Sequence, residues 1–299
     1  MGVFMADYVL TCCSSADLSK ERFDARNIKY LCFHYSLNGV EYPDDLGQTM
    51  PPAMLYERML AGESTKTSQP SAGEYMEFFE KYLEQGLDIL HVTLSTGISG
   101  AYNSAMVAAD QVRAKFPGRK VYVVDSLGAS SGYGLIMETL ADLRDKGKTI
   151  EELNDWLHRH RLNMHHWFFS TDLTFYIKGG RVSKTSGFLG NMLGICPLLN
   201  MDNFGRLIPR EKILGKKRVI RRTVEKMVEN AVDGQDYAGK VFICQSECPE
   251  DAQRLADLVK EKFPKMRGEP EIFPIGATIG SHTGPGTVSL FFWGKKRND

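Results

Sequence analysis

The sequence lacks the features that would make it a membrane-spanning, secreted or nucleotide-binding protein. No segment approaches the roughly 20 consecutive apolar residues of a transmembrane helix. The first ten residues, MGVFMADYVL, have neither the basic region nor the long apolar run of a signal peptide. The chain contains no G-x-G-x-x-G dinucleotide motif and no G-x-x-x-x-G-K-[ST] phosphate loop. We therefore expect a cytoplasmic protein that does not itself bind NAD or ATP.

The chain also lacks an excess of charge of either sign. Lys and Arg together number 37, as do Asp and Glu, so the overall field does not favour nucleic acid as a partner. Locally, eight basic residues and one Glu lie between Gly205 and Arg222. This basic patch is either an ordinary solvated surface or a docking face.

Cysteines are few and lack the spacing of a metal site. Neither the adjacent pair Cys12 and Cys13 nor the pair Cys244 and Cys248 matches a zinc or redox motif. We interpret the six cysteines as buried reduced thiols, and we expect no metal and no cofactor.

What the sequence does contain is an alternation of short apolar runs with amphipathic segments. At 299 residues it is long enough for two domains. In residues 1–163 the β-α-β-α order predicts an α/β domain with a parallel sheet covered on both faces. Residues 164–299 have the pattern of an α+β domain. Residues 28–37, IKYLCFHYSL, read as one strand. Ser71 with Glu74 and Thr149 with Glu152 have the spacing of capping boxes, which predict the starts of two helices.

Three junctions between strands and helices are crowded with hydroxyl groups, at residues 66–71, 94–105 and 124–134. Helix N-termini attract anions, although Ser and Thr also serve there as ordinary caps. The third junction contains Gly128, Ser130 and Gly132 in a G-x-S-x-G pattern. That pattern is also typical of a hydrolase nucleophile, so a serine hydrolase of acyl esters using Ser130 and His282 is the alternative function.

His282 lies in ATIGSHTGPG, residues 277–286, a segment rich in Gly with one Pro. We expect it in a Gly/Pro turn between two strands, with its backbone fixed and its ring pointing outward. Arg181, in KGGRVS, is expected in a similar turn.

Five motifs in order across nearly the whole chain carry a family resemblance: TSQPS, LSTGISGAYNSA, VDSLGASSGYG, GGRVS and IGSHTGPG. Together they resemble the DegV family, which includes the fatty-acid-binding B subunits of bacterial fatty acid kinase. One departure is Cys13, which stands where the family commonly has Asp.

The resemblance implies an α/β fold whose two domains enclose one long-chain fatty acid in a tunnel between or within them. The carboxylate site that it implies consists of Thr67, Ser68, Ser95, Thr96 and His282, with Arg181 in support. Elementary chemistry agrees, because a buried carboxylate needs hydrogen-bond or charge partners. Gly187 and Gly190, which flank Phe188 and Leu189, suggest a movable lid over the tail.

The implied role is a carrier with no catalytic residues of its own. It would present the fatty acid carboxylate to a separate kinase subunit, which forms the acyl phosphate used in phospholipid synthesis. The basic patch could dock that subunit or contact a membrane transiently. A regulatory protein that binds another amphipathic acid is a third possibility.

Overall fold

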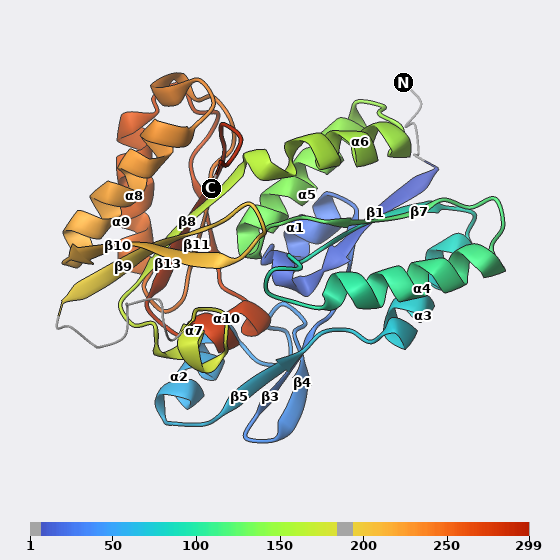
Figure 1. Ribbon diagram of the computed structural model, residues 1–299, viewed down its shortest axis with the longest axis horizontal. Coiled ribbons are helices and arrows are strands. Elements are labelled where there is room, and N and C mark those ends of the chain that lie inside the picture. Colours follow the sequence, from blue (N-terminus) through green and yellow to red (C-terminus); the bar gives the residue numbers. More distant parts are fainter. Residues whose placement is uncertain (1–6, 184–193, 299) are drawn as a thin grey trace.

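The computed structural model describes residues 7–183 and 194–298, which form three β-sheets and the helices around them (Figure 1). The lid proposed around Phe188 lies outside the described residues. The expected α/β fold is confirmed, with one parallel and one mixed sheet as its two largest sheets.

The first sheet is entirely parallel and has the strand order β2-β1-β6-β7. Its strands are β1 (Tyr8–Cys13), β2 (Ile28–Leu31), β6 (Asp88–Thr93) and β7 (Val121–Asp125). Every residue of β1 and β6 is buried, because helices cover both faces. Helices α3 (Ala72–Leu83) and α4 (Ala101–Lys115) cover one face. The S-x-x-E sequence that starts α3 forms the expected capping box between Ser71 and Glu74.

The prediction of one strand over residues 28–37 is wrong. The chain leaves the parallel sheet after Leu31 and enters a second, antiparallel sheet at β3 (His34–Leu37). Phe33 lies between them, and its backbone bonds to the Ser14 hydroxyl and to the amide of Asp44. These tertiary partners redirect the chain within an apolar run. The small sheet also contains β4 (Val40–Pro43) and β5 (Thr65–Ser68), with α2 (Pro52–Leu60) beside it.

The third sheet is mixed and has the order β10-β9-β8-β13-β11-β12. All neighbouring strands are antiparallel except β11 and β12. The strands are β8 (Met164–Ser170), β9 (Ile195–Met201), β10 (Leu207–Leu214), β11 (Phe242–Gln245), β12 (Glu271–Pro274) and β13 (Thr287–Trp293). Helices α8 (Lys216–Asn230) and α9 (Pro249–Lys262) pack on its outer face.

Helix α5 (Ser130–Asp145) lies between the two large sheets (Figure 1). Eleven of its 16 residues are buried, since it packs on both sheets at once. Close approach requires Gly132, where a side-chain carbon would lie 2.6 Å from the Phe291 ring. Helix α6 (Ile150–His160) follows, capped by Thr149 and Glu152 as expected. The boundary at residue 163 remains a prediction, and the halves share this central core.

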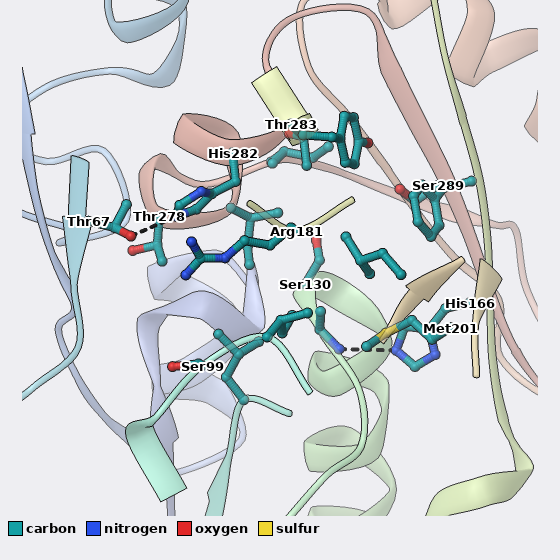
Figure 2. Close-up of a pocket in the computed structure, with 18 of the residues that line it drawn as sticks. Thr67, Ser99, Ser130, His166, Arg181, Met201, Thr278, His282, Thr283 and Ser289 are labelled. Atoms are coloured by element: carbon teal, nitrogen blue, oxygen red, sulfur yellow. Dashed lines mark hydrogen bonds between the residues drawn. The ribbon is translucent and has the colours of Figure 1, made fainter. Parts of the chain in front are cut away.

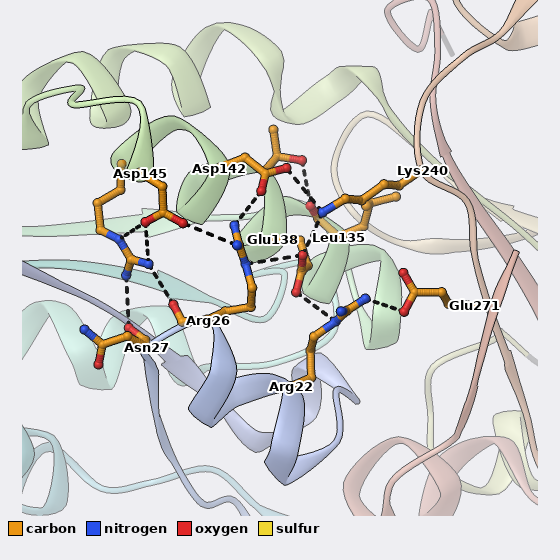
Figure 3. Close-up of polar contacts among 11 residues, drawn as sticks. Arg22, Arg26, Asn27, Leu135, Glu138, Asp142, Asp145, Lys240 and Glu271 are labelled. Carbon is orange, nitrogen blue, oxygen red and sulfur yellow. Dashed lines mark hydrogen bonds and ion pairs between the residues drawn. The ribbon is translucent and has the colours of Figure 1, made fainter. Parts of the chain in front are cut away.

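A buried ion cluster joins α1 (Lys20–Ala25) to α5 (Figure 3). Glu138 of α5 is completely buried, and three cations surround it. Arg22 Nε lies 3.0 Å, Arg26 Nε 3.5 Å and Lys240 Nζ 2.9 Å from its carboxylate oxygens. Arg22 also pairs with Glu271. A buried carboxylate is tolerable here because its charge is balanced within the protein.

Candidate functional site

His282 lies in a helix, so its expected placement in a Gly/Pro turn is wrong. Helix α10 (Ala277–Thr283) includes it, and the turn begins only at Gly284, whose φ is +68°. The helix N-terminus is held by two buried carboxylates. Asp17 Oδ1 accepts the Gly276 amide at 3.1 Å, and Asp44 Oδ2 accepts that of Thr278 at 3.1 Å. These bonds supply N-terminal partners that the local sequence does not provide.

The His282 ring bonds to a side chain from the other half of the chain. Its Nε2 lies 2.7 Å from Thr67 Oγ1 on β5. Its other face packs on Gly179, where a side chain would collide with the ring. Burial, assisted by the positive charge of Arg181, lowers the pKa of His282 to about 4. The imidazole is therefore neutral at neutral pH, and its buried Nδ1 has no hydrogen-bond partner among the described residues.

Arg181 follows the short helix α7 (Thr174–Lys178) and is half-buried. Its Nη1 donates to the Gly179 carbonyl at 2.5 Å. Burial lowers the pKa of the guanidinium from its usual value, but the group stays charged. In the described part of the chain no Asp or Glu forms an ion pair with it. The charge of Arg181 thus lies beside His282 without an acidic partner.

These side chains line one end of a pocket with about 870 Å³ of space free of protein atoms, part of it open to solvent (Figure 2). Thr67, Arg181, Thr278 and His282 lie together, and Ser99 is nearby. The remaining wall is mainly apolar and comes from the segment after β6, the start of α5, α7, α10 and strands of the mixed sheet. Its large apolar residues are Phe33, Leu94, Ile98, Phe168, Met201, Leu207, Ile275, Ile279 and Phe291.

The structure therefore brings together three of the six residues expected at a carboxylate site: Thr67, Arg181 and His282. Ser68 is exposed, because alternate residues of a strand face opposite sides. Ser95 and Thr96 do not line the pocket.

Ser95 and Thr96 have partners inside the protein instead. Ser95 Oγ donates to the Gly205 carbonyl at 2.9 Å and accepts the Gly97 amide at 3.0 Å. Thr96 Oγ1 donates to Asp125 at 2.6 Å. Both hydroxyls stabilise the turn before α4.

The polar lining residues missed from sequence include Gln69, Ser99, Thr278 and Thr283. Gln69 and Ser99 lie within motifs noted for their hydroxyls, so position in the motif was an available signal. Thr278 and Thr283 line the pocket because α10 is a helix. An extended or turn conformation around His282 would not have indicated either residue.

Ser130 lines the pocket at the start of α5 and has a φ of +55°, the strained backbone expected of a nucleophile turn. However, its hydroxyl donates to Asp17 and lies 3.0 Å from Cys244 Sγ. Burial raises the pKa of Asp17 well above its usual value. His282 Nε2 is bonded to Thr67, and His166 Nε2 accepts the Ala129 amide at 3.2 Å. The described contacts place neither histidine as a base for Ser130.

The fold thus combines a parallel sheet and a mixed sheet with a pocket that is polar at one end and mainly apolar along the rest of its wall. Residues 11–295 match the DegV family, and the chain belongs to it. A DegV domain-containing protein of Clostridium perfringens is 32% identical over 97% of this chain and 98% of its own. A protein of Thermotoga maritima named as fatty acid-binding is 35% identical over 77% of each chain.

Solved structures agree with this assignment. A DegV lipid-binding protein of Thermotoga maritima superposes with a TM-score of 0.85 at 28% identity, covering 98% of this chain and 100% of its own. The fatty acid kinase B3 protein of Streptococcus pneumoniae, loaded with linoleic acid, superposes with a TM-score of 0.83 at 23% identity, covering 97% and 100%. The second likeness shows the shared fold. None of the helices within the described residues is long and apolar enough to cross a membrane.

Proposed function

We propose that this protein binds one long-chain fatty acid, with the carboxylate beside Thr67, Arg181 and His282 and the tail in the apolar part of the pocket. The observation that carries the proposal is the charge of Arg181, which has no acidic partner among the described residues at the polar end of this pocket. A carboxylate would supply the missing negative charge. The names of the relatives, fatty acid-binding and lipid-binding, support the same ligand class.

The apolar wall accounts for affinity. Each methylene moved from water into such a pocket contributes about 0.8 kcal/mol. The head group by contrast contributes orientation, because its loss of hydration offsets much of its pairing energy. A long chain with one carboxylate uses both parts of the pocket.

Ser95 belongs to the proposed site on one condition. Its hydroxyl must exchange the bond to the Gly205 carbonyl for one to the carboxylate. Thr96 supports the turn through Asp125, and Ser68 follows Thr67 on the exposed side of β5. Ser95→Ala tests the exchange, because a weaker affinity for fatty acid places the hydroxyl at the head group.

We further propose that the bound carboxylate is presented to a separate kinase subunit. The name of the Streptococcus pneumoniae protein, a fatty acid kinase component, supports this role, as does the lack of a phosphate loop in the sequence. The basic patch is the surface that we propose for docking or for transient membrane contact. Its exposed members include Arg206, Arg210, Lys212, Lys216, Lys217 and Arg218, of which Arg206 pairs with Asp202 and Lys216 with Asp251.

The direct test of ligand class is extraction of the purified protein with acidified organic solvent, followed by mass spectrometry. We expect about one fatty acid per chain, and a lower content in Arg181→Gln. An empty extract, together with no uptake from a panel of fatty acids, would reject the proposed ligand.

The kinase role has its own test. Replacing Lys217 and Arg218 with Glu should slow acyl-phosphate formation by the kinase subunit from the same organism while fatty acid occupancy stays unchanged. Lost occupancy would mean that these residues act on lipid binding. A fluorophosphonate probe should leave Ser130 unlabelled, whereas labelling would favour the hydrolase.

A further inference from the structure

The pocket wall beyond the head group is more polar than an alkyl tail requires. Besides Thr67, Ser99, Ser130 and Thr278, four further hydroxyl-bearing side chains line the pocket: Tyr176, Thr283, Thr287 and Ser289. Figure 2 shows Thr283 next to His282, with Ser289 farther along the wall. A pocket selected only for saturated tails gains nothing from hydroxyl groups.

Two of these hydroxyls are already bonded within the protein. Tyr176 Oη lies 3.0 Å from Thr287 Oγ1, which in turn donates to Ser170 Oγ at 3.3 Å. Burial raises the pKa of Tyr176 above its usual value, so the phenol stays protonated. This chain of hydroxyls links α7 to β13 and β8 and needs no ligand.

The hydroxyl of Thr283, unlike those of Tyr176 and Thr287, is not bonded in this way to another hydroxyl of the described residues. The residue is 7% exposed, yet its Oγ1 has no hydrogen-bond partner among the described residues. It is the last residue of α10 and lines the pocket directly after His282. A buried hydroxyl left without a partner costs free energy that Val, of nearly the same shape, would avoid.

The position of Thr283 limits what could bond to it. The Thr283 and His282 side chains both line the pocket, and Figure 2 shows Thr283 next to His282. An acyl chain whose carboxylate lies beside His282 therefore passes Thr283 within its first few carbons. A saturated fatty acid has only methylene groups there.

We propose that the pocket selects long-chain acids that carry a hydroxyl or keto oxygen on one of the first carbons after the carboxylate, and that Thr283 Oγ1 binds this oxygen. The inference rests on the proposed fatty acid function and adds the class of chain. The Thr283 hydroxyl can donate to a keto oxygen and can donate to or accept from a hydroxyl.

The test measures the dissociation constants of stearate, 3-hydroxystearate and 12-hydroxystearate for the delipidated wild type and for Thr283→Val. In the wild type, 3-hydroxystearate should bind about fivefold to tenfold more tightly than stearate, the effect of one buried hydrogen bond. The Thr283→Val variant should lose this preference and bind stearate at least as well as the wild type. Thr139→Val, on α5 and outside the pocket lining, is the control and should keep the preference.

The other outcomes separate the two proposals. Equal affinities for stearate and 3-hydroxystearate in the wild type would overturn the inference but uphold fatty acid binding. A loss of stearate affinity in Thr283→Val would overturn it as well, by placing the hydroxyl at the carboxylate. A preference for 12-hydroxystearate would contradict the proposed position. Failure of all three acids to bind would reject both proposals.

Discussion

Two polar clusters in this molecule differ in how completely their partners are found inside the protein. Around Glu138, three cations balance one buried carboxylate (Figure 3). Around His282, Arg181 has no acidic partner in the described chain, and His282 Nδ1 and Thr283 Oγ1 have no hydrogen-bond partner there (Figure 2). Both clusters lie between elements distant in sequence. The comparison teaches that balanced charge ties the fold together, whereas a charge at a pocket with no acidic partner in the described chain points to a ligand.

The largest expected effect comes from breaking the balanced cluster. Glu138→Gln removes the charge that faces Arg22, Arg26 and Lys240, and should lower the free energy of unfolding by about 3 kcal/mol. Urea denaturation of the variant and the wild type measures this loss in the free energy of unfolding. Glu271→Gln, at the more exposed end of the same cluster, is the control and should cost at most about 1 kcal/mol. If Glu138→Gln stayed stable but lost fatty acid affinity, the cluster would belong to the binding site.

The next largest effect is expected at Gly179, which packs against the His282 ring. A side chain at position 179 would collide with His282 Nδ1, so Gly179→Ala should shift the ring away from Thr67. We expect fatty acid affinity to fall by at least tenfold, about 1.4 kcal/mol, measured by isothermal titration calorimetry. Gly180→Ala faces open space and, despite its φ of +71°, should keep affinity within about twofold, the ordinary scatter of surface changes. Equal losses of affinity in both variants would show that the backbone conformation at these glycines, and not contact with the His282 ring, controls fatty acid binding.

A pair of threonines sharpens the comparison further. Thr67→Val should weaken fatty acid binding by about tenfold with little loss of stability, because its hydroxyl contacts His282 at the pocket. Thr96→Val should do the reverse, lowering the free energy of unfolding by about 1 kcal/mol through loss of the bond to Asp125. Thermal unfolding and ligand titration on the same samples separate the two. The opposite pattern would exchange the roles of these residues.

The smallest expected effect is the pH dependence of fatty acid binding that arises from His282. Burial and the positive charge of Arg181 lower the pKa of His282 to about 4, against an ordinary value of 6.5. The depressed pKa means that the free protein loses stability as pH falls from 6.5 toward 4, where the ring must charge. A bound carboxylate should raise the pKa, so binding should take up protons and strengthen as pH falls through the raised value. Titration of the His282 ring by NMR, with and without fatty acid, measures the shift; identical midpoints would place the carboxylate elsewhere.

Much of the fold was predictable because its signals are local. The capping boxes at Ser71 and Thr149 fix helix starts through hydrogen bonds within four residues, and both helices form as expected. The strand and helix alternation of the first half also predicted the parallel sheet. The split of residues 28–37 was not predictable, because the partners that redirect Phe33 come from elsewhere in the chain.

The site shows the same division. From the sequence alone came the hydroxyl-rich junctions and the family resemblance, and the resemblance implied the residues Thr67, Arg181 and His282. Tertiary structure alone decided which hydroxyls face the pocket. It turned Ser95 and Thr96 toward Gly205 and Asp125, and it placed the side chains of two distant Asp residues at the N-terminus of α10. The physical reason is that a hydroxyl bonds to whichever partner packing brings within reach, and those partners here lie tens to hundreds of residues away.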